Sequence, residues 1–536
     1  MTKPAISPFD IPLIVDCIGQ FLTKKDYANC ILVSKSMYEG FKYFHWQIIE
    51  NKPCFISNQT VIPLSNVDKL ALRQNGDLIR RLRISEDRKG SVLRFLAEQP
   101  APCKNLLEFE CQTHTNVTMP SLFSFVLDVL EYNSGLRKFT MKNFISEATV
   151  ASCNRFLRIL RNHRSLTTLN LIDTQYMGIG LYRSLLQNIP VTLESLLINW
   201  NLQSPPMPIE FPGEGWRDTY PRLQSFSVRM RRGLEETALI PFLRRCPSLR
   251  RLESLHNWGQ QLCKVGSFLW DPQFFSQLSE ISLDSLVLEE SEWMPLISGM
   301  CGRIKVLTVD DVQIRVSLGD FFKAVTTHWA DTIEIIRLES LRISSQEIEL
   351  ILSTCSKLKS FAVTNDLLTR PRGLRAWRHE DYDDNKADWV CLQLERLELM
   401  VLDCREPYGD DDQMDYFEEE LTTNGVRRVY QQLGRLSKLQ HLQTGWVSCD
   451  EFEMYSNFDL SLESGLEYLE GLKDLRVLDV HFERLKVGQI EIEWMVKNWP
   501  RLQELRGFCP SRDGDVVEMP AHIQWLRGHY PHITVS

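Results

Sequence analysis

From about residue 70 onward, one pattern of apolar and polar positions recurs along the chain. It reads L-x-x-L-x-L, with Ile, Val, Phe, Met or Cys replacing some leucines, as in LTTLNL (166–171) and LERLEL (394–399). Fifteen such phrases begin between residues 79 and 502, and ten consecutive spacings between them lie between 25 and 30 residues. A period of roughly 20–29 residues with this phrase is the signature of leucine-rich repeats.

Each phrase predicts a short strand, because the L-x-L alternation suits a strand with one buried face. Before many phrases the apolar residues recur at three- and four-residue spacing, as in RFLRILRNHRSL (155–166), and this predicts a helix. Prolines such as Pro247 and Pro500 separate helix from strand. The predicted fold is α/β, a curved leucine-rich-repeat solenoid with strands inside and helices outside, in which each repeat buries its leucines only against its neighbours.

The polar positions between the strand leucines are the candidate binding residues of the array. Their mixture of charge and polarity points to a protein-sized target, whose identity the sequence does not give. The candidate target-binding residues are Arg81, Arg83, Thr168, Asn170, Ser225, Ser227, Arg337, Glu398, His441 and Asp479.

Two long insertions, at about 364–392 and 403–431, interrupt the period. The first has a basic half followed by an acidic half, and the second contains DCREPYGDDDQMDYFEEE. Loops of this length in a compact array are usually functional or disordered. The acidic runs fit either a solvated loop or an acidic edge that contacts a partner, and aromatic residues such as Trp377 and Tyr416 keep the second interpretation open.

The N-terminal stretch from Ile11 to Phe41 is apolar and too short to bury its own surface. Its apolar residues fall at helical spacing, and Thr23 with Asp26 forms a T-x-x-D capping box for a second helix. Ser34 can cap a third. Because each of the three short helices is apolar on more than one face, the first repeat can cover one side and a partner protein is expected to cover the other.

The same stretch resembles the F-box motif, in about forty of the 536 residues, and an F-box followed by leucine-rich repeats is a known family architecture. Leu13 stands where an acidic residue is common in that motif, and Met37 or Tyr38 near the usual tryptophan. The matching positions are Ile11-Pro12-Leu13-Ile14, Ile18, Phe21-Leu22, Asp26, Cys30, Val33-Ser34-Lys35, Phe41 and Trp46.

The resemblance implies a substrate receptor of an SCF-type ubiquitin ligase. In that family the F-box docks on the Skp adaptor, a cullin holds the adaptor, and the repeats bind a target protein without bond chemistry of their own. Some of the residues implied to contact the adaptor can instead pack only the three-helix core. The implied adaptor-contacting residues are Pro12, Leu13, Ile14, Ile18, Phe21, Leu22, Val33 and Trp46.

The expected organisation is an F-box-like helical domain at 8–50, a connecting segment at 51–70 and the repeat array at 71–536. The alternative is a non-catalytic leucine-rich-repeat scaffold or inhibitor, in which the N-terminal helices only cap the first repeat. The number of apolar residues distinguishes the two alternatives. A cap needs only one apolar face and a polar outer face, whereas the stretch from Ile11 to Phe41 carries more apolar residues than one face requires.

Charge and motifs limit the other function classes. With 61 basic and 70 acidic residues the net charge is −9, which disfavours nucleic acid as a partner. The fourteen cysteines include no CxxC pair, and no HExxH, GxSxG, GxGxxG or phosphate-binding loop occurs. We therefore expect no enzyme, no cofactor and no metal site.

Targeting signals are also missing from the sequence. No secretory signal is visible, and no apolar run reaches the ~18 residues of a membrane span. We therefore expect no membrane partner, reduced cysteines, and a location in the cytoplasm, the nucleus or both.

Overall fold

The computed structural model describes the chain in two compact units, residues 1–249 and 250–536. The described residues are 11–19, 21–51, 74–85, 103–112, 120–142, 149–175, 179–201, 219–230, 236–255, 276–284, 294, 297–299, 302–310, 318–339, 343, 345–364, 374–375, 388–399, 401–402, 423–444, 460–480, 487–508 and 519–536.

The first unit opens with three helices, α1 (Pro12–Gly19), α2 (Lys24–Val33) and α3 (Lys35–Gln47). The described strands that follow are β1 (Ile48–Asn51), β2 (Arg81–Ser85), β3 (Glu108–Gln112), β4 (Lys138–Lys142), β5 (Thr168–Gln175), β6 (Ser195–Asn201) and β7 (Ser225–Met230), and each pairs in parallel with the next. The short helix η2 (Gly76–Leu78) precedes β2, and the repeat helices are α6 (Pro120–Tyr132), α7 (Val150–Asn162), α8 (Ile179–Asn188) and α9 (Glu236–Leu243).

The second unit continues the same plan. Its main strands are β8 (Arg251–Leu255), β9 (Glu280–Asp284), β10 (Val306–Asp310), β11 (Ile335–Glu339), β12 (Ser360–Thr364), β14 (Arg396–Leu399), β16 (His441–Thr444), β17 (Val477–Asp479), β18 (Glu504–Arg506) and β19 (Thr534–Val535), paired in parallel in that order. The helices whose bounds the structure describes there are α12 (Leu318–Trp329), α13 (Ser345–Thr354), α14 (Thr423–Gly434), η4 (Leu466–Gly471), α15 (Gln489–Asn498) and α16 (Ala521–His529).

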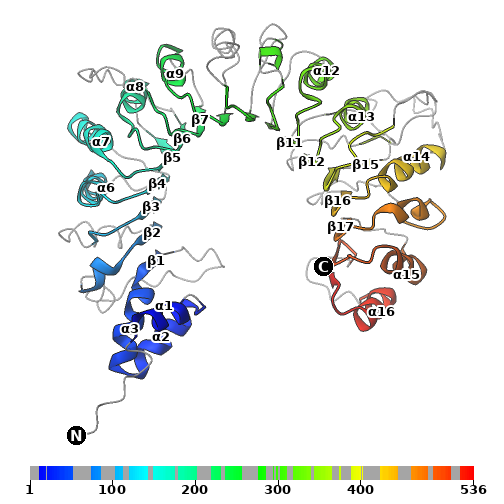
Figure 1. The fold of residues 1–536 in the computed structure, drawn as a ribbon, viewed down its shortest axis with the longest axis horizontal. Helices are drawn as coiled ribbons and strands as arrows, with labels where there is room; N and C mark the ends of the chain where they lie inside the picture. Colours follow the sequence, from blue (N-terminus) through cyan, green and yellow to red (C-terminus); the bar gives the residue numbers. More distant parts are fainter. Residues whose placement is uncertain are drawn as a thin grey trace, which may run out of the picture. The chain divides into compact units, whose positions relative to one another are not determined.

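Within each unit the repeat helices lie on one side of the strands (Figure 1). The strand leucines point toward those helices and are buried, as Leu169, Leu196 and Leu338 show. The alternate side chains lie on the opposite side, which we name the open face. Every one of the fifteen sequence phrases contains a described strand, so the predicted leucine-rich-repeat fold is confirmed.

Three phrases lack a final apolar residue, namely LRRLES (249–254), LQHLQT (439–444) and LQELRG (502–507), and the structure gives a local reason for the last two. In LQHLQT, Thr444 takes the apolar place and is buried with its hydroxyl making no hydrogen bond among the described residues. In LQELRG, Gly507 has a φ of 77°, a left-handed conformation that a leucine would adopt only with strain. Its N–H donates to the carbonyl of Ser536 beside β19. The tail HYPHITVS (529–536) alternates apolar and polar residues, a pattern that predicts a closing strand, and Thr534–Val535 form β19 on β18.

Two elements differ from the simple repeat pattern. Strand β1 carries no repeat phrase, yet it pairs with β2 directly after α3. Within the first insertion, β13 (Leu374–Arg375) pairs with β15 (Val401–Leu402) as a separate two-stranded sheet. The predicted connecting segment, apart from Asn51, and most of both insertions, including Trp377 and Tyr416, lie outside the described residues.

The predicted capping box of the second helix is confirmed. The Thr23 N–H donates to the Asp26 carboxylate at 2.8 Å, and the Asp26 N–H donates to the Thr23 hydroxyl at 3.4 Å. These bonds satisfy donors that the first turn of α2 would otherwise leave without partners.

Candidate protein-interaction surfaces

An aromatic cluster holds the three N-terminal helices together. Tyr27 of α2 stacks on Phe44 of α3 with ring centroids 5.6 Å apart, and Phe41 beside them is buried. The Tyr27 hydroxyl donates to the Gly19 carbonyl at the end of α1. Gly19 has no space for a side chain, because a Cβ there would lie 2.7 Å from the Phe44 ring. The helices therefore have a small core of their own.

Outside this core, the helices leave several large apolar side chains in contact with solvent. Phe21 is 85% exposed, Leu32 84% and Val33 69%, and Ile11 and Ile18 are also exposed. We call these five residues the N-terminal apolar patch. These residues come from α1, the residue before it, the turn after it and α2, so a small three-helix segment carries several exposed apolar side chains, as protein interaction sites do.

The structure separates the eight residues implied to contact an adaptor. Ile18, Phe21 and Val33 belong to the N-terminal apolar patch, so they are available to a partner. Ile14, Leu22 and Trp46 are half-buried. The side chains of Pro12 and Leu13 lie outside the described residues.

Leu32 is the residue that the sequence analysis missed. It stands between Ile31 and Val33 near the end of α2, where three apolar residues in succession must point in different directions around the helix. One short helix cannot bury three successive side chains on one side. The run of three apolar residues therefore indicates that at least one of them is exposed.

The three helices join the repeats through α3. The chain passes from α3 directly into β1, and the Arg80 N–H donates to the Gln47 carbonyl at 3.0 Å. Figure 1 shows the three helices beyond β1, at the end of the strand row of the first unit.

On the open face of the first unit, both predicted arginines are in ion pairs with the neighbouring strand. Arg81 lies 2.7 Å from Glu108, and Arg83 lies 3.4 Å from Glu110. Glu110 also lies 2.7 Å from Lys142 of β4. Pairs of this kind on a half-exposed sheet stabilise it by about 0.2–1 kcal/mol each. They also restrict the positions of the two guanidinium groups on this face.

The neutral candidates of this face lie on the strands that follow. The Asn170 amide donates to the Thr140 hydroxyl at 3.2 Å, and Thr168 and Ser225 are half-buried. Ser227 is buried, and its hydroxyl makes no hydrogen bond within the described part of the chain. Buried Ser227 is therefore a poor candidate for direct contact with a target.

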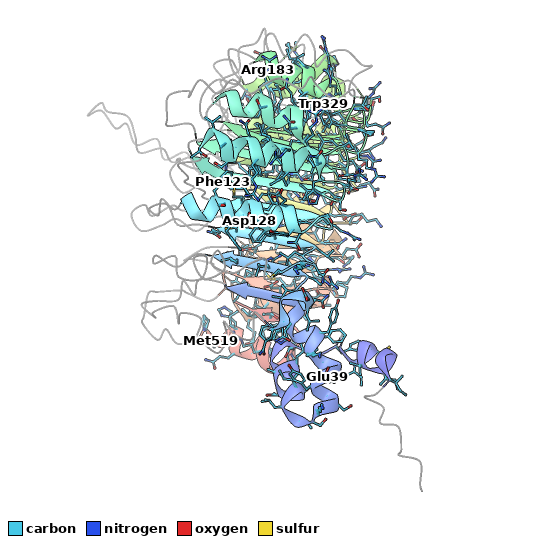
Figure 2. The ribbon with its side chains drawn as sticks, turned by 90° about the vertical axis from the view of Figure 1, so that its left-hand side faces the viewer. Glu39, Phe123, Asp128, Arg183, Trp329 and Met519 are labelled. Carbon is cyan, nitrogen blue, oxygen red and sulfur yellow. The ribbon has the colours of Figure 1, made fainter. Side chains whose placement is uncertain are left out.

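On the helix side, charges link successive repeats instead of facing the open surface. Arg155 of α7 lies 2.7 Å from Asp128 of α6 and also pairs with Glu131. Figure 2 shows Asp128 and Phe123 on α6, with Phe123 buried against Phe156 of the next helix. This side of the unit is built from contacts within the array.

A charged cluster brings together three predicted residues of the second unit. Glu398, His441 and Asp479 lie on β14, β16 and β17, which are neighbours in the sheet. Arg396 pairs with Glu398, and Arg506 lies 3.7 Å from Asp479 and 2.9 Å from Glu504. The carboxylates of Glu398 and Asp479 are buried beneath the more exposed guanidinium groups.

His441 lies within this cluster, where its surroundings disfavour the charged imidazolium. Burial and then the positive charge of Arg396 lower its pKa, and its Nε2 makes no hydrogen bond in the described structure. Arg337, the remaining candidate, is exposed on β11 and forms no ion pair with another described residue. The structure therefore groups three of the four candidates of the second unit and leaves Arg337 apart.

The histidines and cysteines show features of structural residues. The Nε2 of His163 lies 3.1 Å from the Asn133 carbonyl, and burial lowers the pKa of this imidazole. Burial raises the pKa of Cys103 and Cys391 to about 12, so both thiols are protonated at neutral pH. Within the described ranges, no three His, Cys, Asp or Glu side chains are placed to hold a metal ion. No described helix is both long and apolar enough to cross a membrane.

Comparison with known proteins finds similar chains among solved structures alone. No protein-family model matches the sequence, and no curated protein matches it. Among solved structures, the chain is similar to one titled "Crystal structure of TLR13-ssRNA13 complex", with 11% sequence identity and a TM-score of 0.37. The match covers 87% of this chain and 65% of that protein, so this chain spans slightly less than two thirds of its length.

Proposed function

We propose that this protein is the substrate-recognition subunit of an SCF-type ubiquitin ligase. Its N-terminal helices dock on a Skp-type adaptor, and through that adaptor on a cullin, while its repeats bind a target protein. It needs no cofactor and does no bond chemistry, and it acts in the cytoplasm or the nucleus. The parallel strand–helix array supports the coarser part of this role, a protein-interaction scaffold.

The N-terminal apolar patch carries the proposal. If α1–α3 served only to cap the first repeat, their apolar side chains would lie against it. Instead the aromatic core of the three helices is closed around Tyr27, Phe41 and Phe44, while Phe21, Leu32 and Val33 remain exposed. Surplus apolar surface of this kind is what the proposed adaptor would cover.

The proposed receptor accelerates ubiquitin transfer by position alone. Holding a target beside the ligase raises the local concentration of its lysines near the ubiquitin-conjugating enzyme, which makes the transfer effectively intramolecular. The residues that matter are then those of the two binding surfaces, and no residue of this chain needs an activated nucleophile.

Pull-down of a purified Skp adaptor by the full chain tests the proposal. The test variant is Phe21→Asp with Leu32→Asp, because both side chains are exposed and their replacement leaves the helix core intact. Wild type should retain the adaptor. The variant should lose at least about tenfold in affinity, because a carboxylate buried in a dry interface without a partner is costly.

A matched control separates this interface from a general effect of added charge. Ile490 of α15 is 69% exposed, so Ile490→Asp places a carboxylate on an exposed apolar position of the array, and the single variants Phe21→Asp and Leu32→Asp are compared with it charge for charge. The control should bind the adaptor like wild type, and circular dichroism should show both variants folded. Failure of wild type to bind the adaptor would instead favour the capped scaffold.

A further inference from the structure

The charged cluster on β14–β18 presents its arginines to solvent and keeps two carboxylates beneath them. The side chain of Arg396 is 54% exposed, and that of its partner Glu398 is 11% exposed. The side chain of Arg506 is 40% exposed, whereas that of Asp479 is 4% exposed. The third carboxylate, Glu504, is also less exposed than the Arg506 side chain with which it pairs. A group that approaches the open face here therefore meets guanidinium groups first.

Both arginines keep donors for a further acceptor, because a guanidinium group carries five N–H donors. Among the described residues, Arg396 donates only from Nε, to Glu398. Arg506 donates from one terminal nitrogen to Glu504 at 2.9 Å, and its contact with Asp479 is an ion pair of 3.7 Å. The carboxylates thus restrict the guanidinium groups and leave most of their donors for a ligand.

A second observation at the same place points to a ligand. His441 of β16 is the register neighbour of Arg396, and its Nε2 is shielded from water without a hydrogen bond to any described residue. A buried polar atom without a partner costs free energy, so a group bound over this imidazole recovers part of that cost. The charged residues that act on His441 come from three strands, β14 (Arg396 and Glu398), β17 (Asp479) and β18 (Glu504 and Arg506).

We propose that this cluster binds an acidic segment of the target protein. Carboxylates of the segment pair with the guanidinium groups of Arg396 and Arg506, on either side of His441. Three strand steps lead from β14 through β16 and β17 to β18, a distance of about 14 Å. An extended segment covers this distance in about four residues, so acidic residues about four positions apart fit the two arginines. The assignment rests on the proposed function, in which the repeats receive a protein.

Fluorescence anisotropy with the full chain and a labelled peptide tests the assignment. The probe is Gly-Glu-Gly-Ser-Gly-Glu-Gly, and the comparison peptides carry Gln or Lys at both Glu positions. Because the chain has a net charge of −9, it repels an acidic peptide in general, and binding of the probe therefore indicates a local site. Wild type should prefer the Glu peptide to both others, and this comparison needs no variant to fold.

The test variant combines Arg396→Gln with Glu398→Gln. It removes one arginine and its buried carboxylate together, so the net charge is unchanged and no buried charge is left without its partner. The control combines Arg501→Gln with Asp474→Asn, which removes an ion pair of 2.8 Å that lies outside the open-face strands of the same unit.

The Glu peptide should bind wild type and the control with similar affinity. The test variant should bind it about tenfold more weakly at low salt, and added salt should reduce the difference because screening acts on these charges. Equal affinity for the test variant and the control would overturn the proposal. Preference of wild type for the Lys peptide, or no binding of the Glu peptide, would also overturn it.

The pH dependence of binding gives an independent readout through His441. Burial and the positive charge of Arg396 lower the pKa of this imidazole in the free protein. A carboxylate bound to Arg396 offsets that charge and raises the pKa, so binding takes up a proton and tightens as the pH falls from about 7.5 to about 6. The peptide glutamates stay ionised over this range.

The variant His441→Gln should bind the Glu peptide without this pH dependence. An affinity of wild type that does not change with pH, or the same change in His441→Gln, would overturn the placement of the segment over His441.

The same proteins distinguish failure of this assignment from failure of the proposed function. The Arg396→Gln, Glu398→Gln variant should retain the adaptor in the pull-down, because its changes lie on β14 of the second unit. The Phe21→Asp, Leu32→Asp variant should keep its affinity for the Glu peptide. A wild type that binds the peptide but not the adaptor would refute the ligase role and leave the acidic-segment site standing.

Discussion

At Gly434 two backbone segments approach so closely that no side chain fits between them. A Cβ on Gly434, the last residue of α14, would lie 1.9 Å from the Tyr468 carbonyl oxygen of η4. A Cβ on Gly471 would likewise lie 2.0 Å from the Gly434 carbonyl oxygen. Neither oxygen can rotate away as a flexible side chain could, so the contact fixes how η4 packs on α14.

Gly434→Ala should therefore destabilise the second unit by about 1–3 kcal/mol, the usual cost of an overpacked contact. The measurement is the thermal unfolding midpoint. Gly528→Ala in α16 is the control, because nothing lies within 4 Å of its added Cβ, and alanine is the better helix former by about 1 kcal/mol. Equal midpoints for the two variants would contradict the close approach.

Individual side chains were harder to place from the sequence than the elements that carry them. Arg81 and Arg83 were predicted to face the open surface, and their partners Glu108 and Glu110 stand 27 residues later, at the same positions of the next phrase. Aligning successive phrases would have predicted both pairs. By contrast, the exposure of Leu32 depends on how α2 packs against α3, which helical spacing alone does not determine.

Asn133 links two repeats of the first unit at the end of α6. Its side-chain oxygen accepts from the Leu106 N–H at 2.8 Å, and its amide donates to the carbonyls of Cys103 at 2.9 Å and Val129 at 2.8 Å. Asn133 is buried, so these three bonds satisfy backbone groups that water cannot reach.

Asn133→Ala should cost about 1–3 kcal/mol, because it leaves a buried N–H without an acceptor. The thermal midpoint should fall, and the Leu106 amide should exchange with solvent faster. Asn105→Ala removes a similar bond, from the Asn105 amide to the Asp77 carbonyl, but on an exposed side chain. We expect that control to change stability by less than about 0.5 kcal/mol. An equal loss in both variants would show that burial of Asn133 is not decisive.

Helices and strands could be predicted from the sequence wherever a periodic pattern of apolar residues marks them. The strand phrases located the fifteen main-sheet strands from β2 to β18, because a strand with one buried face must alternate, and the same rule predicts β19 in the alternating tail HYPHITVS. Strand β1 could not be found this way. Its residues IIEN (48–51) lack the repeat phrase. They form a strand because they directly follow α3, which ends beside β2, and they pair with the edge of β2.

The repeat architecture also sets how a local defect spreads through the molecule. In each unit a main-sheet strand pairs only with the strands before and after it, so stability is approximately a sum over repeats and their interfaces. Repeats that are not neighbours in the array make little direct contact, so a defect in one repeat has little direct effect on a distant one. A globular core would instead distribute a defect over the whole domain.

Leu338→Ala in β11 tests this property in the second unit. Leu338 is fully buried, and its truncation should cost about 2–5 kcal/mol through lost contacts and a cavity. Hydrogen exchange should quicken most in β10, β11 and β12, and least in β17 and β18. Leu392→Ala, a change at an exposed leucine before β14, should leave the exchange pattern of wild type intact. A uniform increase across β8–β19 would mean that the unit opens as one cooperative body, and nearest-neighbour coupling would then not describe this array.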